Sequence, residues 1–191
     1  MANDGTIYMN SRLGGSYIAS FSPDTGAFSA FTSGTWPIPM HADASGEHLI
    51  VLNAWDSTLS VFAAGAETAL LRTIPLGLPR GTTDRLPEMA IDSSHHLAYV
   101  AYPEFGKIAV VDWQSGQVVT TLEIQGYPAG EEGGGPGEMQ VAVDENSGQL
   151  FVLWNNRQAK LQTYALDENY QLVNEYALAG LDCPGSADDF A

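Results

Sequence analysis

The stretch HLAYVAYPEFGKIAVVDWQSGQVVTTLEI, residues His96–Ile124, consists of three apolar runs separated by two short gaps. The runs LAYVAY, KIAVVD and QVVTTLEI have the length of strands and are rich in Val, Ile, Thr and Tyr, whereas the gaps PEFG and WQSG contain the turn residues Gly, Pro and Ser. Links this short join neighbouring strands head to tail. The stretch therefore predicts a three-stranded antiparallel meander.

The same pattern of three runs occurs four times along the chain. The first run of each repeat ends at Asn10, Asn53, Tyr102 and Trp154, so successive repeats are 43, 49 and 52 residues apart. One further short strand precedes the second, third and fourth repeats: Met40–Ala44, Met89–Asp92 and Met139–Asp144. A four-stranded unit with a period in this range is typical of propeller blades.

We therefore predict an all-β protein, a β-propeller segment of about four four-stranded blades, the first lacking its inner strand. The blades are expected near residues 5–34, 39–76, 88–125 and 138–178, within a propeller region 1–180 that is followed by a polar tail, 181–191. Four such repeats form an arc whose ends expose apolar faces and unpaired edges. A second copy or another chain is expected to complete the ring; a closed four-bladed ring, with sharper angles between blades, is the alternative.

Composition excludes several partner classes. The 191 residues include 7 Lys+Arg against 23 Asp+Glu, a formal charge of −16, which repels nucleic acid and anionic membranes. The single Cys183 cannot form an internal disulfide, and no apolar run reaches the length of a membrane span. Because no signal segment is visible, the cytoplasm is the favoured location; a trimmed N-terminus would allow the periplasm or the exterior.

Two stretches resemble known propeller repeats. TIYMNSRLGGSYIASFSPDTGAFSAF and PMHADASGEHLIVLNAWDSTLSVFA are similar to the opening blade and a blade junction of the lactonase-type (6-phosphogluconolactonase-like) family, and LAYVAYPEFGKIAVVDWQSGQVVTTLEIQGYP resembles the YVTN repeat. The resemblance covers residues 5–180, about half of a seven-bladed ring, and implies a propeller fold. It departs from the lactonase group where Glu88 stands in LPEMAID in place of a second junction histidine.

Propeller ligands bind at the mouth of the channel, where long loops join one blade to the next. His41, at the inner strand and next to the channel, is a candidate general base, and Glu88 and Glu138, expected at equivalent rim positions, are its candidate acid partners. The alternative is a histidine held by backbone hydrogen bonds. The candidate ligand-binding residues at the mouth are Arg12, Asn53, Trp55, Arg80, Arg85, Tyr102 and Arg157.

The arginines in these loops suggest an anion site, and the alternative is that they pair with nearby carboxylates. No cofactor is expected. Glu88, Glu138, Asp84 and His41 could hold a divalent metal ion, although no metal-ligand spacing is present, and the pair His95-His96 is expected to cap a turn.

Two function classes remain open. The first is a lactonase-like propeller that binds a small anionic or sugar-acid ligand and hydrolyses a lactone. The second is a non-catalytic YVTN-type module that serves as a protein-interaction scaffold.

Overall fold

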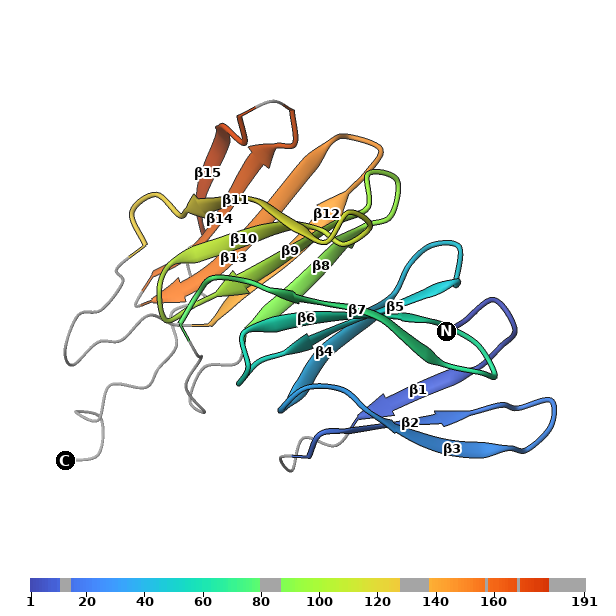
Figure 1. Cartoon of the computed structure of the whole chain (residues 1–191). Helices are drawn as coiled ribbons and strands as arrows, with labels where there is room; N and C mark the ends of the chain where they lie inside the picture. Colours follow the sequence, from blue (N-terminus) through green and yellow to red (C-terminus); the bar gives the residue numbers. More distant parts are fainter. Residues whose placement is uncertain (11–14, 80–86, 128–137, 157, 168, 179–191) are drawn as a thin grey trace, which may run out of the picture.

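The computed structural model describes residues 1–10, 15–79, 87–127, 138–156, 158–167 and 169–178. The described chain forms fifteen strands in four separate antiparallel sheets, and within each sheet neighbouring strands follow the order of the sequence. The four sheets lie side by side in the order of the sequence and together form an arc (Figure 1). This arrangement confirms the predicted all-β propeller segment, and we call the sheets blades 1 to 4.

Blade 1 has three strands and the other blades have four, as predicted. Blade 1 consists of β1 (Ile7–Asn10), β2 (Tyr17–Phe21) and β3 (Phe28–Thr32). Blade 2 consists of β4 (Pro37–Ala42), β5 (His48–Asn53), β6 (Thr58–Ala63) and β7 (Ala69–Pro75). Blade 3 consists of β8 (Glu88–Asp92), β9 (Leu97–Tyr102), β10 (Lys107–Asp112) and β11 (Gln117–Glu123). Blade 4 consists of β12 (Met139–Asp144), β13 (Gln149–Asn156), β14 (Gln158–Ala165) and β15 (Leu172–Leu178).

The core lies between successive blades rather than inside any one of them. Ile50, Leu59 and Val61 of blade 2 are buried against Val100 and Val111 of blade 3. A second cluster joins blades 3 and 4, and a smaller one joins blades 1 and 2. Because full burial of one such aliphatic side chain contributes about 1.5–3 kcal/mol, each blade depends on its neighbours for stability.

The inner and outer strands differ as a propeller requires. The inner strand β8 lies against β4 on one side and β12 on the other. The outer strands β7, β11 and β15 are largely exposed, and β11 alternates between exposed and half-buried residues. The outer edge of the blades therefore faces water.

Aspartates at the ends of the inner strands shape the turns that follow. Asp92 accepts hydrogen bonds from the backbone N–H of His95 (3.0 Å) and the hydroxyl of Ser94 (2.7 Å) through Oδ1, and its Oδ2 lies 2.8 Å from Nδ1 of His95. Burial disfavours the charged carboxylate of Asp92, but these hydrogen bonds outweigh it and lower the pKa. His95 thus belongs to the turn, as expected. Asp43 and Asp144 accept equivalent bonds in their own turns.

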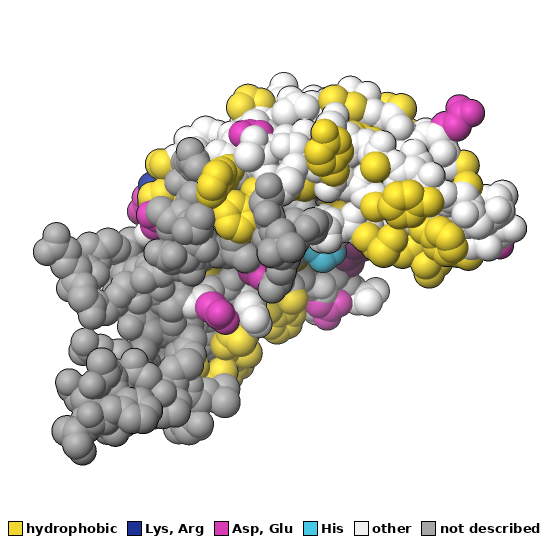
Figure 2. Space-filling view, turned by 90° about the horizontal axis from the view of Figure 1, so that it is seen from below, with side chains coloured by type: hydrophobic (Ala, Val, Ile, Leu, Met, Phe, Trp, Pro, Cys, Tyr) yellow, Lys and Arg dark blue, Asp and Glu magenta, His cyan; other side chains and the backbone are white. Residues whose placement is uncertain are grey.

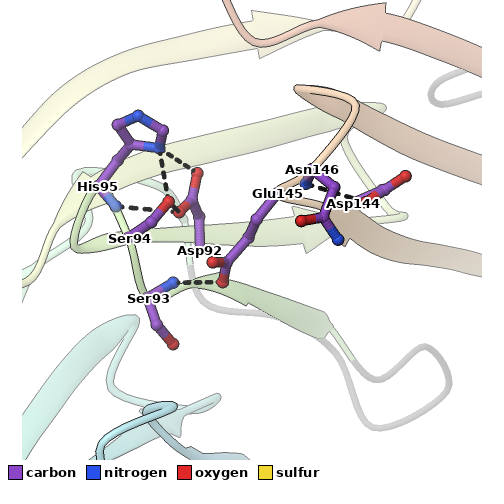
Figure 3. Close-up of polar contacts among 7 residues, drawn as sticks. All are labelled: Asp92, Ser93, Ser94, His95, Asp144, Glu145 and Asn146. Atoms are coloured by element: carbon purple, nitrogen blue, oxygen red, sulfur yellow. Dashed lines mark hydrogen bonds and ion pairs between the residues drawn. The ribbon is translucent and has the colours of Figure 1, made fainter.

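The same turns connect the blades to one another. The backbone N–H of Ala44 donates to Oγ of Ser93 (2.9 Å), and the N–H of Ser93 donates to Oε1 of Glu145 (2.7 Å; Figure 3). Each of these three residues directly follows a turn aspartate. The turns therefore fix the angle between blades 2, 3 and 4 at the face opposite the expected channel mouth.

The N-terminal residues bind blade 1 to blade 2. Asn3 N–H donates to the carbonyl of Gly46 (3.0 Å), and Ala66 N–H donates to Oδ2 of Asp4 (2.8 Å). Gly46 has a φ of 69°, and a Cβ there would lie 2.5 Å from the backbone nitrogen of Asn3. Only glycine therefore fits this close approach between the two blades.

Candidate functional site

The inner strands β4, β8 and β12 line the middle of the arc. At one level of these three strands, only one of them carries a titratable side chain. Counting back two residues from Asp43, Asp92 and Asp144 gives His41, Ala90 and Ala142. Asp92 and Asp144 end their strands and Asp43 directly follows β4, where its N–H still bonds to the carbonyl of His48, so the three residues occupy the same level. His41 is thus an imidazole in a row where the other two blades carry methyl groups.

His41 reaches solvent, yet protein atoms crowd its ring. This partial desolvation lowers the pKa of His41, and a hydrogen bond with the backbone of Met89 on β8 opposes the shift only in part. The contact with Met89 is the backbone hydrogen bond that the alternative interpretation of His41 expects. The same environment keeps the ring neutral at pH 7, which is the form that accepts a proton.

The two candidate acids do not stand at equivalent positions. Glu88 is the first residue of β8, half-buried, and lies four residues before Asp92. Glu138 is exposed, directly before β12, and lies six residues before Asp144. The residue level with Glu88 on β12 is Gln140. Glu88 therefore lies nearer the level of His41 than Glu138 does.

Asn53 is fully buried at the end of β5, and its amide is held by protein partners. Its Oδ1 accepts from the hydroxyl of Ser33 (2.7 Å) and the N–H of Gly34 (2.8 Å). Its Nδ2 donates to the hydroxyls of Thr58 (3.0 Å) and Ser60 (2.9 Å). A Cβ at Gly34 would lie 2.5 Å from Cγ of Asn53, so glycine is required there. Asn53 thus fastens the loop from blade 1 to blade 2.

Trp55 is half-buried and packs edge-on against Trp36, with ring centroids 4.9 Å apart. Trp36 has a φ of 58° although it precedes a proline, a conformation that is uncommon for a bulky residue. Its carbonyl accepts from the N–H of Ala54 (3.0 Å), so the loop around Asn53 holds it in place. Trp36 is not among the residues predicted for the site; its signal in the sequence is an aromatic residue directly before Pro37 in an interblade loop.

Tyr102 is buried in the core between blades 2 and 3. Its hydroxyl lies 3.1 Å from Oγ of Ser57, and burial raises its pKa despite this hydrogen bond. Like Asn53, it lies within the wall of the arc and joins two blades at this rim.

The arginine cluster predicted at the mouth falls on Arg12, Arg80, Arg85 and Arg157, which lie outside the described residues. Two lysines at the same rim are described, and each lies beside a carboxylate of its own blade. Nζ of Lys107 is 3.4 Å from Glu123, and Nζ of Lys160 is 2.8 Å from Glu175 and 5.4 Å from the centre of the Trp154 ring. Pairing with carboxylates therefore holds for these two lysines.

Metal binding has no visible scaffold in the described part of the chain, where no three His, Cys, Asp or Glu side chains gather closely enough to hold an ion. Asp84, one of the candidate ligands, lies outside it. Likewise, none of the segments that the structure describes is a helix long and apolar enough to cross a membrane.

Comparison with known proteins gives a fold but no family. No protein-family model matches the chain, and no curated relative matches its sequence. Among solved structures, hydrazine synthase from Kuenenia stuttgartiensis is similar with a TM-score of 0.73 and 17% identity, over 93% of this chain and 47% of that one. Virginiamycin B lyase from Staphylococcus aureus has a TM-score of 0.66 and 12% identity, over 94% of this chain and 54% of that one.

A third similar structure is Hsv2 from Kluyveromyces lactis, with a TM-score of 0.64 and 15% identity, over 92% of this chain and 60% of that one. All three are β-propellers, and their names cover unlike activities. The chain spans about half the length of these solved chains. At such low identity the likeness establishes the fold alone.

Proposed function

We propose that the inner strands of this propeller segment bind a small anionic or sugar-acid ligand, and that His41 acts there as a general base in lactone hydrolysis. The observation that carries the proposal is His41 itself: a solvent-reaching imidazole with a lowered pKa, level with Ala90 and Ala142 on the neighbouring inner strands. A neutral imidazole whose counterparts on the two neighbouring inner strands are methyl groups can face a ligand.

The chemistry follows from the protonation states. Neutral His41 takes a proton from water as the water oxygen attacks the lactone carbonyl, and the ester C–O bond then breaks. The leaving alkoxide takes a proton from an acid, for which Glu88 is better placed than Glu138. The loop arginines Arg12, Arg80, Arg85 and Arg157 would bind the carboxylate of the product.

The test is hydrolysis of a panel of sugar-acid lactones, together with calorimetric binding of the corresponding sugar acids. We expect His41→Ala to lower kcat/KM at least ~100-fold, because a positioned general base contributes about 10²–10⁴-fold. His95→Ala is the matched control, since His95 is exposed in a turn at the opposite face and should leave turnover unchanged. A fully active His41→Ala variant would refute the catalytic role.

The pH profile separates a base from a merely structural histidine. Because its surroundings lower the pKa of His41 from 6.5, turnover should persist below pH 6.5 and fall only as pH drops through the folded value. A protein that neither binds nor hydrolyses any member of the panel would instead support the non-catalytic scaffold.

A further inference from the structure

Blade 1 carries an apolar face that no other blade of the chain covers. Ile18, Tyr8 and Phe31 turn toward blade 2. The residues that alternate with them turn away, and register pairs them in rows across the sheet: Ile7 with Phe21 and Phe28, Met9 with Ala19 and Ala30, and Tyr17 with Thr32. Four of these side chains are large, apolar and exposed: Ile7 (37%), Met9 (45%), Tyr17 (65%) and Phe28 (68%). We call this surface the blade 1 face.

A sheet with water on one side normally carries polar residues on that side. The blade 1 face carries none but Thr32 in these rows, and it has no charged residue. Figure 2 views the molecule from the side where blade 1 lies lowest in Figure 1, and hydrophobic side chains gather there toward the right. A continuous exposed apolar surface of this kind marks an interface.

The other end of the arc has a second face on which no other blade of this chain packs. Trp154, Tyr164 and Leu150 of blade 4 turn toward blade 3. Two rows of alternating residues turn away, and they are Ala142–Phe151–Thr163–Asn174 and Gln140–Leu153–Leu161–Tyr176. These two rows contain no charged residue, whereas the next row on the same face, Asp144–Gln149–Ala165, contains Asp144. Tyr176 is 50% exposed, Phe151, Leu153 and Leu161 are half-buried, and Thr163 is buried. We call this surface the blade 4 face.

The charge distribution indicates what covers these two faces. The chain has 30 charged residues, 7 basic and 23 acidic, and the rows of the blade 1 face and two rows of the blade 4 face lack them. A chain with a net charge of −16 repels a second copy wherever acidic surfaces meet, so a contact between copies requires uncharged faces. The blade 1 face and the two uncharged rows of the blade 4 face meet that requirement.

We propose that a second copy of this chain covers both faces: the blade 1 face of each copy packs on the blade 4 face of the other. A two-fold axis along the channel then makes the two contacts identical and closes eight blades into one ring. Each contact repeats the blade-on-blade packing seen three times within the chain. This inference stands whether or not His41 binds a ligand.

The first test is the mass of the full chain by sedimentation equilibrium. We expect a species twice 20.4 kDa. Met9→Asp and Tyr176→Asp should each weaken dimerisation at least ~10-fold, because each places a carboxylate in both contacts. Val119→Asp is the matched control, since Val119 is 56% exposed on β11, away from both terminal faces, and should leave the dimer intact. Unchanged thermal unfolding of the dilute variants would confirm that they fold.

A mixture of the two variants makes the test specific for this geometry. In a mixed dimer, one contact carries both substitutions and the other carries none. A mixture of Met9→Asp and Tyr176→Asp should therefore form mixed dimers more tightly than either variant dimerises alone. Packing of blade 1 on blade 1 would instead leave Tyr176→Asp dimeric. A wild-type monomer at every concentration, or a dimer insensitive to Met9→Asp, would overturn the proposal.

Discussion

Blade 2 and blade 1 are built from similar meanders, but they differ in what lies on their two faces. Blade 2 is covered on both sides: Leu52 and Leu59 pack toward blade 3, and Val51 and Phe62 pack toward blade 1. Blade 1 is covered on one side only, and its other face is apolar and exposed. The difference shows that a propeller blade is stabilised by the blades packed on its two faces. We therefore expect the terminal blades of the arc to need a packing partner on their outer faces.

The largest expected effect concerns a side chain on a covered face. Leu59→Ala should lower the free energy of unfolding by about 2–5 kcal/mol, because Leu59 is fully buried between blades 2 and 3 and its removal leaves a cavity. On the blade 1 face, Tyr17→Ala should change it by less than about 0.5 kcal/mol.

Both free energies come from urea titrations, made in a Tyr176→Asp background so that self-association does not contribute. Equal losses at Leu59 and Tyr17 would mean that the blade 1 face is covered within the monomer, and the comparison between the two blades would then be wrong.

A smaller difference in the free energy of unfolding is expected between alanine variants of two asparagines, Asn53 and Asn10, which end the first strand run of their repeats. Asn53→Ala should cost about 1–3 kcal/mol, because it leaves the half-buried Gly34 N–H without an acceptor and the buried hydroxyl of Ser60 without a donor. Asn10 is half-buried and donates one bond, from Nδ2 to the carbonyl of Pro37 (2.6 Å), so Asn10→Ala should cost about 0.5–1.5 kcal/mol. Thermal unfolding of both variants measures the difference. A stable Asn53→Ala variant that loses ligand binding would instead assign Asn53 to the ligand site.

The smallest effect is a pH dependence carried by the turns. Burial disfavours the charged form of Asp92, yet its hydrogen bonds lower the pKa below the ordinary 3.8. The stabilisation is therefore complete above pH 3.8 and is lost as pH falls through the folded pKa, because the unfolded carboxyl binds its proton first.

Asp92→Asn should accordingly flatten the acid limb of the unfolding free energy measured against pH. Asp112→Asn is a useful comparison, since hydrogen bonds from Ser115 and Gln114 also lower that pKa, although burial opposes them. An acid limb that is unchanged in both variants would show that the turn aspartates do not cause the loss of stability at low pH.

Much of the fold was predictable because each strand carries its own signal. The runs rich in Val, Ile and Thr, the Gly and Pro turns and the repeated Asp43, Asp92 and Asp144 gave the fifteen strands and the missing inner strand of blade 1. The partners of individual side chains were harder to predict, since they depend on how strands pair and not on spacing along the chain. Asn10 and Asn53 both end a first run, yet Asn10 donates to the carbonyl of Pro37 on blade 2, whereas Asn53 accepts from Gly34 in the loop between blades 1 and 2.

The candidate site was predictable only in part. The sequence pointed to His41 and Glu88, and both lie on the inner strands. It could not show that Asn53 and Tyr102 are buried, because a polar residue at a strand end can point either to solvent or into the wall. Trp36 escaped notice because its left-handed backbone lies in a loop held by residues distant in sequence: Ala54 N–H donates to the carbonyl of Trp36, and Trp55 N–H donates to the carbonyl of Thr35.

Oxidation of two methionines tests the contrast between covered and uncovered faces most directly. Met89 is buried between blades 2 and 3, and Met9 lies on the blade 1 face. With hydrogen peroxide as the oxidant, mass spectrometry should find Met89 protected at every protein concentration. Met9 should be oxidised readily in dilute protein and be protected in concentrated protein, where the second copy covers it. Equal oxidation of Met9 and Met89, or a Met9 whose oxidation does not depend on concentration, would contradict the account.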